Sequence, residues 1–281
     1  MPGIELRQIL TTMAIQEKGF RWPDEEELAL IQRVSPEGFE TGSGLCGYLE
    51  GLRAKHLAVY PVKCTPELYE ELLARNYRRN GEVFYRPLCS ACTACRNLRV
   101  LVDEFTPNRS MRRCWKRNAD LRIRVRARHT FTKEYHWLYE DYIIRRHWFG
   151  RGGSTMTGDT REFYEFLVAS CLPGPRCVEF RLRRRLLAVG VFDETPNSYS
   201  AVYCYYDCDH ARRSLGTFNI LWLIDHARNN GKKYVYLGYY VDSCPLMNYK
   251  AKFLPHERWH PDGRWERVDR IAKPGGDEDQ K

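Results

Sequence analysis

The sequence predicts an α/β fold in which the larger, C-terminal part is built in the order strand, helix, helix, three strands, helix, strand and short helix. Segments that alternate apolar and polar side chains are interleaved with segments of helical periodicity between residues 120 and 253. A chain of 281 residues with 43% hydrophobic and 13% aromatic content can also bury a substantial core. Ahead of this part lies a basic region with a cysteine cluster, which we expect to form its own domain.

Four segments are expected along the chain. They are a leader of weak helical character (1–40), a basic, cysteine-containing N-terminal domain (41–119), the α/β domain (120–255) and a polar tail (256–281). No run approaches the roughly 20 apolar residues of a membrane span, and the N-terminus lacks the pattern of a signal peptide. We therefore expect a cytoplasmic protein without membrane contact.

The N-terminal domain contains two predicted helices and a strand. Residues 66–74 carry leucines at helical spacing behind Thr65, a candidate N-cap. Residues 97–105 alternate like a strand. The basic segment 106–118 is expected to be a helix with Thr106 as its N-cap and Pro107 in the first position, where a missing amide proton costs nothing.

The α/β domain begins with a strand over residues 120–128, in which apolar residues alternate with arginines, so that one face is expected to be buried and the other charged. A helix capped by Thr132 follows over residues 132–148. A glycine-rich loop (150–158) leads to a second helix over 159–171, where Asp159 and Glu162 form a candidate capping box.

The remaining elements complete the order. A hairpin is predicted over residues 177–194 and a strand over 198–207. The amphipathic helix 214–231 is closed by Gly231, a buried strand covers 232–240, and 245–253 adds a short helix. This is the element order of the GNAT acyltransferase fold, although periodicity alone does not distinguish it from other α/β arrangements.

The charge pattern indicates a polyanionic partner. The formal net charge is +9 and the isoelectric point is about 9.0. Between Arg75 and Arg128, basic residues are mixed with aromatic ones, which is typical of surfaces that neutralise phosphates and stack unpaired bases. On charge alone, a merely basic soluble protein remains an equal alternative.

The loop before the long helix offers a candidate phosphate site. Residues 213–218, Arg-Ser-Leu-Gly-Thr-Phe, resemble the GNAT loop whose backbone amides bind a pyrophosphate at a helix N-terminus. Phe218 stands where that loop has a small residue, and its bulk is expected to obstruct coenzyme A. The alternative is an ordinary helix start with a packing glycine.

Two further groups carry candidate chemistry. Cys46, Cys89, Cys92 and Cys95 have local spacing suited to structural zinc or an iron–sulfur cluster, or they are reduced cysteines in a turn-rich segment. Arginine suits bidentate binding of a carboxylate or phosphate. The candidates for such binding are Arg78, Arg79, Arg86, Arg146 and the adjacent His147, each of which has a structural alternative as a salt-bridged side chain or a helix-dipole partner.

Together these motifs resemble the bacterial aspartate/glutamate leucyltransferases of the arginyl-tRNA–protein transferase superfamily. The matching residues before 122 are Cys46, Tyr48, residues 77–81, Tyr85, Arg86, Cys89, Cys92, Cys95, Arg109, Ser110, Arg112, Arg113, Arg117 and Asp120. The later ones are Tyr142, Arg146, His147, residues 200–203, 213–217 and 236–239, Met247, Tyr249 and Lys250.

The resemblance implies transfer of leucine from leucyl-tRNA to the N-terminal amine of proteins that begin with Asp or Glu, which creates a degradation signal. No cofactor is required, because the ester is already activated and an α-amine titrates near 8. The acceptor or the tRNA 3′ end is then expected at Arg78, Arg79, Arg86, Arg146 and His147. The tRNA is expected at Arg109, Arg112, Arg113, Arg213, Ser214, Gly216 and Thr217, and the acyl group at Tyr239, Tyr249 and Lys250, with Asp207 as an orienting group.

Three alternatives stay open at this point. An arginyl donor would need a carboxylate in the acyl pocket, which the sequence does not locate. An acetyl-CoA-dependent N-acetyltransferase would share the fold and the loop, and a non-enzymatic RNA-binding protein would share the basic region. No residue identifies itself as the general base from sequence alone.

Overall fold

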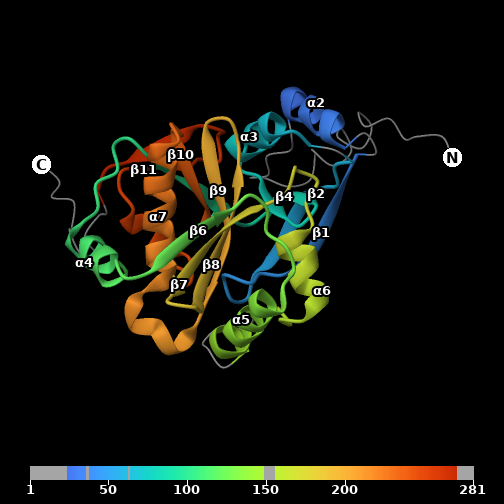
Figure 1. The fold of residues 1–281 in the computed structure, drawn as a ribbon. Coiled ribbons are helices and arrows are strands. Elements are labelled where there is room, and N and C mark those ends of the chain that lie inside the picture. Colours follow the sequence, from blue (N-terminus) through green and yellow to red (C-terminus); the bar gives the residue numbers. More distant parts are fainter. Residues whose placement is uncertain (1–23, 36–37, 63, 149–155, 271–281) are drawn as a thin grey trace, which may run out of the picture.

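The structure, a computed structural model, describes residues 24–35, 38–62, 64–148 and 156–270. It contains a four-stranded sheet with the order β1-β2-β4-β3 and an eight-stranded sheet with the order β12-β11-β5-β10-β9-β8-β7-β6. The small sheet lies beside the large one, with α2 and α3 above it (Figure 1). The described helices include none that is long and apolar enough to cross a membrane.

The small sheet and its two helices form from the first part of the chain. Their bounds are α2 Glu25–Val34, β1 Phe39–Leu45, β2 Arg53–Val59, α3 Pro66–Ala74, β3 Arg78–Asn80 and β4 Val83–Pro87. The apolar faces of α2 and α3 meet β2 and β4 in one buried cluster, which includes Leu30, Tyr69 and Phe84. Tyr69 and Phe84 stack with ring centroids 5.0 Å apart.

The large sheet follows the predicted order of elements. Its strands are β5 Arg96–Leu101, β6 Arg122–Arg126, β7 Arg176–Leu182, β8 Arg185–Glu194, β9 Ser198–Tyr206, β10 Tyr234–Tyr240, β11 His256–Trp259 and β12 Trp265–Val268. The helical segments are α4 Arg109–Arg117, α5 Lys133–Ile143, η1 Ile144–Trp148, α6 Thr160–Phe163, η2 Tyr164–Val168, η3 Cys208–Arg213, α7 Leu215–Asn229 and η4 Asn248–Lys252. The GNAT-like α/β fold predicted from the sequence is thus confirmed.

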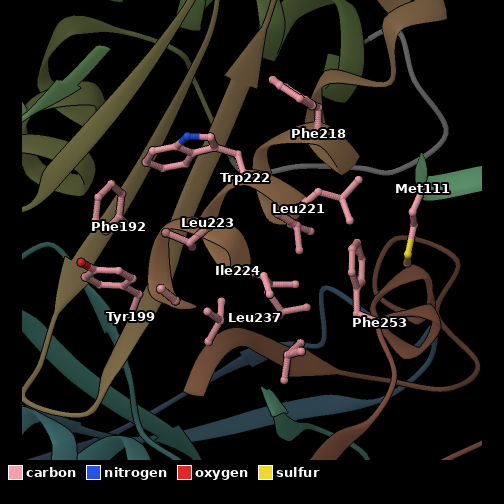
Figure 2. Close-up of a cluster of buried hydrophobic side chains, with 14 of the residues drawn as sticks. Met111, Phe192, Tyr199, Phe218, Leu221, Trp222, Leu223, Ile224, Leu237 and Phe253 are labelled. Atoms are coloured by element: carbon pink, nitrogen blue, oxygen red, sulfur yellow. The ribbon is translucent and has the colours of Figure 1, made fainter. Parts of the chain in front are cut away.

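Helices cover the large sheet on both faces. The long helix α7 lies against one face with α4 beside it, and α5 and α6 lie on the other (Figure 1). Figure 2 shows the buried cluster on the α7 face, which includes Phe218, Trp222, Phe253 and Leu237. The α5 face has its own cluster around Tyr139, because alternate side chains of β8 and β9 point to opposite sides of the sheet.

The two sheets are joined by strand β5 and by buried polar contacts. β5 comes from the cysteine-containing region but pairs with β10 and β11 in the large sheet. Arg79 on β3 forms a buried bidentate ion pair with Asp193 on β8, with nitrogen–oxygen distances of 2.8 and 2.9 Å. The parts of the chain before and after residue 120 therefore share a sheet and a buried charge pair.

Several local predictions are confirmed. Thr65 and Thr132 accept hydrogen bonds from the backbone N–H groups of Leu68 and Tyr135, as N-caps do. Asp159 accepts one from Glu162 in the same way. Gly231, with φ of +66°, follows the end of α7, in the conformation that favours glycine at a helix C-terminus.

Other local predictions are wrong. Thr106 does not cap α4; Asn108 does, because its side chain accepts from Met111 N at 3.0 Å and Pro107 lies outside the helix. Strand β6 has no buried face, since it is the last strand of the sheet and every residue from Arg122 to Arg126 is exposed. The second helix of the domain ends at Val168 rather than at 171.

Some elements were not expected. Helix α2 lies within the segment expected to be a leader of weak helical character, and β11 and β12 lie within the segment expected to be a polar tail. Most of the glycine-rich loop 150–158 falls outside the described residues.

Candidate active site

The large sheet splits between β9 and β10. These two strands run parallel and pair at only three positions, from Tyr234 opposite Ser198 to Tyr236 opposite Ser200. β9 continues to Tyr206 and β10 to Tyr240 without further pairing to each other, and the pairing of β10 with β5 shifts by one residue between Tyr236 and Gly238. The split therefore opens toward the C-terminal ends of both strands, which is where side chains from other elements enter.

Arg78 occupies the base of the split. Its guanidinium donates to Ser200 Oγ at 3.0 Å and to the Ala201 carbonyl, both on β9. On the β10 side it packs against Gly238, where a Cβ atom would lie 3.3 Å from Arg78 Cζ. Gly238 has φ of +82°, so this position requires glycine for its backbone as well as for space. The small sheet thus inserts a cation between the separated strands.

Lys250, on η4, is buried beside this cation. Its Nζ donates to the Tyr239 carbonyl and lies 3.3 Å from Met247 Sδ, and only 6% of the residue is exposed. Burial lowers the pKa of Lys250 to about 7, and the charge of Arg78 adds to the effect. Within the described residues no carboxylate forms an ion pair with it. Lys250 is therefore divided between its neutral and charged forms near neutral pH.

The two tyrosines of the predicted acyl site have different surroundings. The Tyr239 hydroxyl is buried, 3.0 Å from the Asn76 carbonyl and 3.1 Å from the Tyr85 carbonyl, so it joins β10 to the small sheet. Tyr249 is 42% exposed and lies near Cys204 and Tyr206, on the open part of β9. Of the two, Tyr249 is the one available to a bound substrate.

Asp207 closes the end of β9. It accepts from Asp209 N at 3.0 Å at the start of η3, and it pairs with Arg185 at 2.6 Å and with His210 at 3.2 Å. These contacts hold η3 against the turn between β7 and β8. Asp207 therefore lies at the mouth of the split, where it stabilises the position of η3.

The loop of residues 213–217 forms the other side of the mouth. Ser214 adopts a left-handed conformation, with φ of 55°, and its side chain does not cap α7. Gly216 approaches the ring of Tyr206, and Thr217 Oγ1 lies 3.4 Å from Lys252 Nζ. Arg213 is held by Asp120 in a bidentate pair at 2.7 and 2.8 Å. The amide groups at the start of α7 thus face the mouth without a side-chain cap.

Phe218 does not obstruct this loop. Its ring is buried on the sheet side of α7, with centroids 5.2 Å from Phe180 and 5.4 Å from Trp115 (Figure 2). The expectation that its bulk blocks a pyrophosphate is therefore wrong, because the side chain points into the core.

Arg79 and Arg86 are used inside the protein. Arg79 is fully occupied by Asp193 and by the Gly81 and Ala169 carbonyls. Arg86 pairs with Glu27 at 2.8 Å and lies over the ring of Tyr77, whose hydroxyl donates to the same carboxylate at 2.6 Å. Side chains in these environments hold the fold, and we assign them no contact with a substrate.

Arg146 lies at the mouth on the α5 side. It is exposed on η1, next to Tyr142 and to Tyr206 at the end of β9. Its neighbour Arg145 is paired with Asp209 at 2.6 Å and with Asp141 at 3.4 Å. The side chain of His147 lies outside what the structure describes.

The basic residues of α4 lie on the surface. Arg109, Arg112 and Arg113 are all exposed, and none forms an ion pair with a carboxylate in the described part of the chain. Their helix packs on α7 through Met111 and Cys114, which are buried. They remain available to an anionic partner.

The four cysteines of the predicted metal site line one cavity of about 90 Å³. Burial raises the pKa of the Cys95 thiol to about 12, and the neighbouring Cys89 and Cys46 add to the effect. Among the described residues, however, no group of three or more His, Cys, Asp or Glu side chains is close enough to hold a metal ion. The geometry provides no ready ligand set, and zinc or an iron–sulfur cluster stays a prediction.

The residues that contact Arg78, Arg79 and Arg86 were not identified from the sequence. Ser200 and Gly238 place Arg78 in the split, and Asp193 and Glu27 neutralise Arg79 and Arg86. A glycine within a buried strand is a signal for close approach of another group, and Gly238 carries that signal. The carboxylates carry none, because their partners are far away in the chain.

Comparison with known proteins places both parts of the chain. Residues 44–113 match the N-terminal family model of arginine-tRNA-protein transferase and residues 134–260 match the C-terminal one. The aspartate/glutamate leucyltransferase of Pseudomonas aeruginosa (strain LESB58) is 42% identical over 220 residues, which cover 76% of this chain and 92% of that protein. The protein of the same name from Pseudomonas savastanoi pv. phaseolicola is 40% identical over 227 residues, covering 79% and 94%.

Solved structures are more distant. The structure of L-PGS from Bacillus licheniformis has a TM-score of 0.41 at 12% identity and covers 80% of this chain and 78% of that one. The C-terminal domain of a putative lysylphosphatidylglycerol synthetase from Agrobacterium fabrum has a TM-score of 0.40 at 14% identity, with coverage of 53% and 47%. The identity and coverage of the sequence matches decide the relationship: this chain belongs to the arginine-tRNA-protein transferase family.

Proposed function

We propose that this protein transfers leucine from leucyl-tRNA to the N-terminal α-amine of proteins that begin with Asp or Glu, and so marks them for degradation. The names of relatives that match over more than nine tenths of their length support the reaction. The observation that carries the proposal is the split between β9 and β10, which has Arg78 and Lys250 at its base and the start of α7 at its mouth.

The reaction needs little beyond positioning and proton transfer. The lone pair of the amine nitrogen attacks the carbonyl carbon of the aminoacyl ester. The bond from that carbon to the ribose oxygen then breaks. One proton leaves the amine and one is gained by the ribose oxygen, so the exchange is balanced without a cofactor. Holding the two reactants together in one site supplies a large part of the rate acceleration.

Lys250 is the proposed carrier of that proton. A general base works best when its pKa is near the working pH, and burial brings the pKa of Lys250 to about 7. The neutral lysine accepts a proton from the attacking amine and returns it to the departing ribose oxygen. Arg78 favours the neutral form by charge repulsion and stabilises the negative charge that develops on the former carbonyl oxygen in the tetrahedral intermediate.

The proposed substrate positions follow from the mouth of the split. The uncapped start of α7, at Ser214, Gly216 and Thr217, takes a phosphate near the tRNA 3′ end. Arg146 takes the carboxylate of the acceptor's first residue, because it is exposed at the mouth. Tyr249 borders the acyl group. Asp207 and Tyr239 hold the surrounding loops and strands in place.

The direct test offers leucyl-tRNA with radiolabelled leucine to peptides that begin with Asp, Glu or Ala. We expect label on the Asp and Glu peptides and at least roughly tenfold less on the Ala peptide. A panel of differently charged tRNAs decides the donor: transfer of arginine in preference to leucine would replace the leucyl assignment. Equal labelling of all three peptides, or of none, would overturn the acceptor assignment.

A further inference from the structure

Six exposed cations gather at the end of the large sheet, beside the mouth of the split. We call them the basic surface: Lys116, Arg117, Arg122, Arg183, Arg184 and Arg212. They come from three segments, namely the end of α4 with the start of β6, the turn between β7 and β8, and η3. None belongs to the split itself.

Hydrogen bonds, strand pairing and an ion pair hold these segments together. Arg117 on α4 donates to the Arg212 carbonyl of η3, and Arg213 donates back to the Arg117 carbonyl at 3.0 Å. Strand β6 begins with Arg122 opposite Arg181 of β7. On the other side, η3 is tied to the β7–β8 turn by the pair of Arg185 with Asp207 at 2.6 Å. The three segments therefore form one continuous end of the molecule.

The charge of this surface is not balanced by the protein. Neighbouring arginines do have carboxylate partners: Arg181 pairs with Glu134 and Glu179, Arg185 with Asp207, and Arg213 with Asp120. After these pairs are formed, no carboxylate of the described residues lies within ion-pair distance of the six cations of the basic surface. Clustered cations of this kind release counterions from a phosphate backbone and attract it from a distance.

The position of the basic surface indicates which of the two substrates binds to it. η3 continues directly into the Ser214 start of α7, so the surface borders the proposed place of the tRNA 3′ end. When a tRNA places its single-stranded end in the split, its acceptor-stem duplex must lie outside the mouth. An acceptor protein presents one carboxylate, and the proposed partner of that carboxylate is Arg146. Binding of the acceptor therefore does not account for the six cations of the basic surface. Duplex RNA is recognised largely through its phosphates and 2′-hydroxyls, which exposed arginines and lysines suit.

We propose that the basic surface binds the acceptor-stem duplex of the donor tRNA through its phosphates, without reading base sequence. This inference rests on the proposed function, since it assumes that the 3′ end enters the split. It assigns to tRNA binding a set of side chains from the end of α4, the start of β6, the β7–β8 turn and η3.

The test compares three single charge reversals, Arg122→Glu, Arg184→Glu and Arg212→Glu, with the matched control Lys233→Glu. Lys233 is also exposed but lies at the opposite end of β10, away from the mouth. Two donors are used for leucyl transfer to an Asp peptide: leucyl-tRNA, and 2′(3′)-O-leucyladenosine, which has no duplex. Binding of an uncharged acceptor-stem minihelix is measured by fluorescence anisotropy over a range of salt concentrations.

Each reversal on the basic surface is expected to raise the KM for leucyl-tRNA roughly threefold to tenfold. A plot of log affinity for the minihelix against log salt concentration should become less steep, its slope decreasing in magnitude by about 1 per lost phosphate contact. The rate with leucyladenosine should not change, and Lys233→Glu should behave like the unmodified protein in every assay.

Several results would overturn the inference. They are an unchanged KM and salt slope, an equal loss with leucyladenosine, weakened binding of full tRNA with unchanged minihelix binding, or an equal loss of affinity for single-stranded RNA of the same length. Failure of the proposed function is distinguishable, because the unmodified protein would then yield no product from either donor while minihelix binding is still measured.

Discussion

Two groups of arginines in this protein use the same side chain in opposite ways. Arg79 and Arg86 are buried at the small sheet, each against a carboxylate from a distant part of the chain. Arg122 and Arg184 are exposed at the end of the large sheet and have no carboxylate partner among the described residues. Both groups lie in basic stretches of the sequence, so composition does not separate them. A partner carboxylate decides whether an arginine holds the fold or remains free for an anion.

Lys250 and Arg78 beside it are exceptions, because each is a buried cation without such a carboxylate among the residues that the structure describes. Burying an unpaired charge is costly, and a lysine responds by shifting its pKa downward. Proteins retain such groups mainly where a function requires them. Three kinds of cation can therefore be compared: buried and paired, exposed and unpaired, and buried and unpaired. Mutation can test each of them.

The largest expected effect is on stability, at the buried pair. Arg79→Met leaves Asp193 buried without a partner and should lower the free energy of unfolding by about 3–5 kcal/mol. Urea unfolding monitored by tryptophan fluorescence measures the loss. The matched exposed change, Arg184→Met, should alter stability by less than about 0.5 kcal/mol.

The double variant Arg79→Met/Asp193→Leu guards against simple failure to fold. Removing both charges should recover most of the loss, because the uncompensated carboxylate is its cause. Similar losses for Arg79→Met and Arg184→Met would contradict the division between the two groups of arginines.

Arg146 tests the assignment of an exposed arginine to the acceptor. Arg146→Gln removes a charged hydrogen bond and should lower kcat/KM for Asp and Glu peptides roughly 10- to 100-fold. The control is Arg145→Gln on the adjacent residue, which is already paired with Asp209 and Asp141. A greater loss in the control than in Arg146→Gln would move the acceptor site elsewhere.

Lys250→Met should stabilise the protein while it lowers activity. Replacing buried charge by apolar side chains of similar volume is neutral or gains about 1–4 kcal/mol, and we expect a gain on the order of 2 kcal/mol. The pKa of Lys250 in the folded protein is below its value of 10.5 in the unfolded chain. Burial of Lys250 therefore destabilises the unmodified protein increasingly as pH falls from 10.5 to about 7, and by a constant amount below that. The gain should therefore be greatest at and below about pH 7. Thermal unfolding at about pH 6.5 and about pH 9.5 checks the direction, and a loss at both would contradict it.

The smallest effect comes from freeing a paired arginine. Asp120→Asn removes the partly exposed ion pair with Arg213 and should lower the free energy of unfolding by less than about 1 kcal/mol. Hydrogen bonds from Arg213 lower the pKa of Asp120, so this contribution is present above the unfolded pKa and is lost as pH falls through the lowered one. The released Arg213 adds a cation at the mouth, so minihelix affinity should rise roughly twofold to fivefold. Weaker RNA binding would contradict this prediction.

Much of the fold could be predicted because the signals are local. The caps at Thr65, Thr132 and Asp159 and the helical periodicity of α5 and α7 are contained within single segments. The exposure of β6 could not be predicted, because alternation of apolar residues and arginines is the same for a central and an edge strand, and its edge position depends on the whole sheet. Strands β11 and β12 have four residues each and are too short for a periodic signal.

The site was predictable in its residue types but not in its geometry. Lys250 and Arg78 could be picked out, yet their proximity depends on the small sheet inserting β3 beside the split. Phe218 shows the opposite case: a position in a motif does not reveal which way a side chain points, and this one points into the core. The roles of Arg79 and Arg86 depend on Asp193 and Glu27, which only the folded chain brings close.

The pH dependence of leucyl transfer tests the central claim, that Lys250 in the split carries the proton. Saturating leucyl-tRNA and an Asp peptide are used to measure kcat/KM for the peptide between about pH 5.5 and about pH 9.5 in the unmodified protein and in Lys250→Met. We predict that activity of the unmodified protein falls below about pH 7 as Lys250 becomes charged, in addition to the ionisation of the peptide amine near 8. In Lys250→Met the step near pH 7 should disappear and the rate should fall roughly 100-fold or more. A variant with normal activity and an unchanged profile would contradict the account.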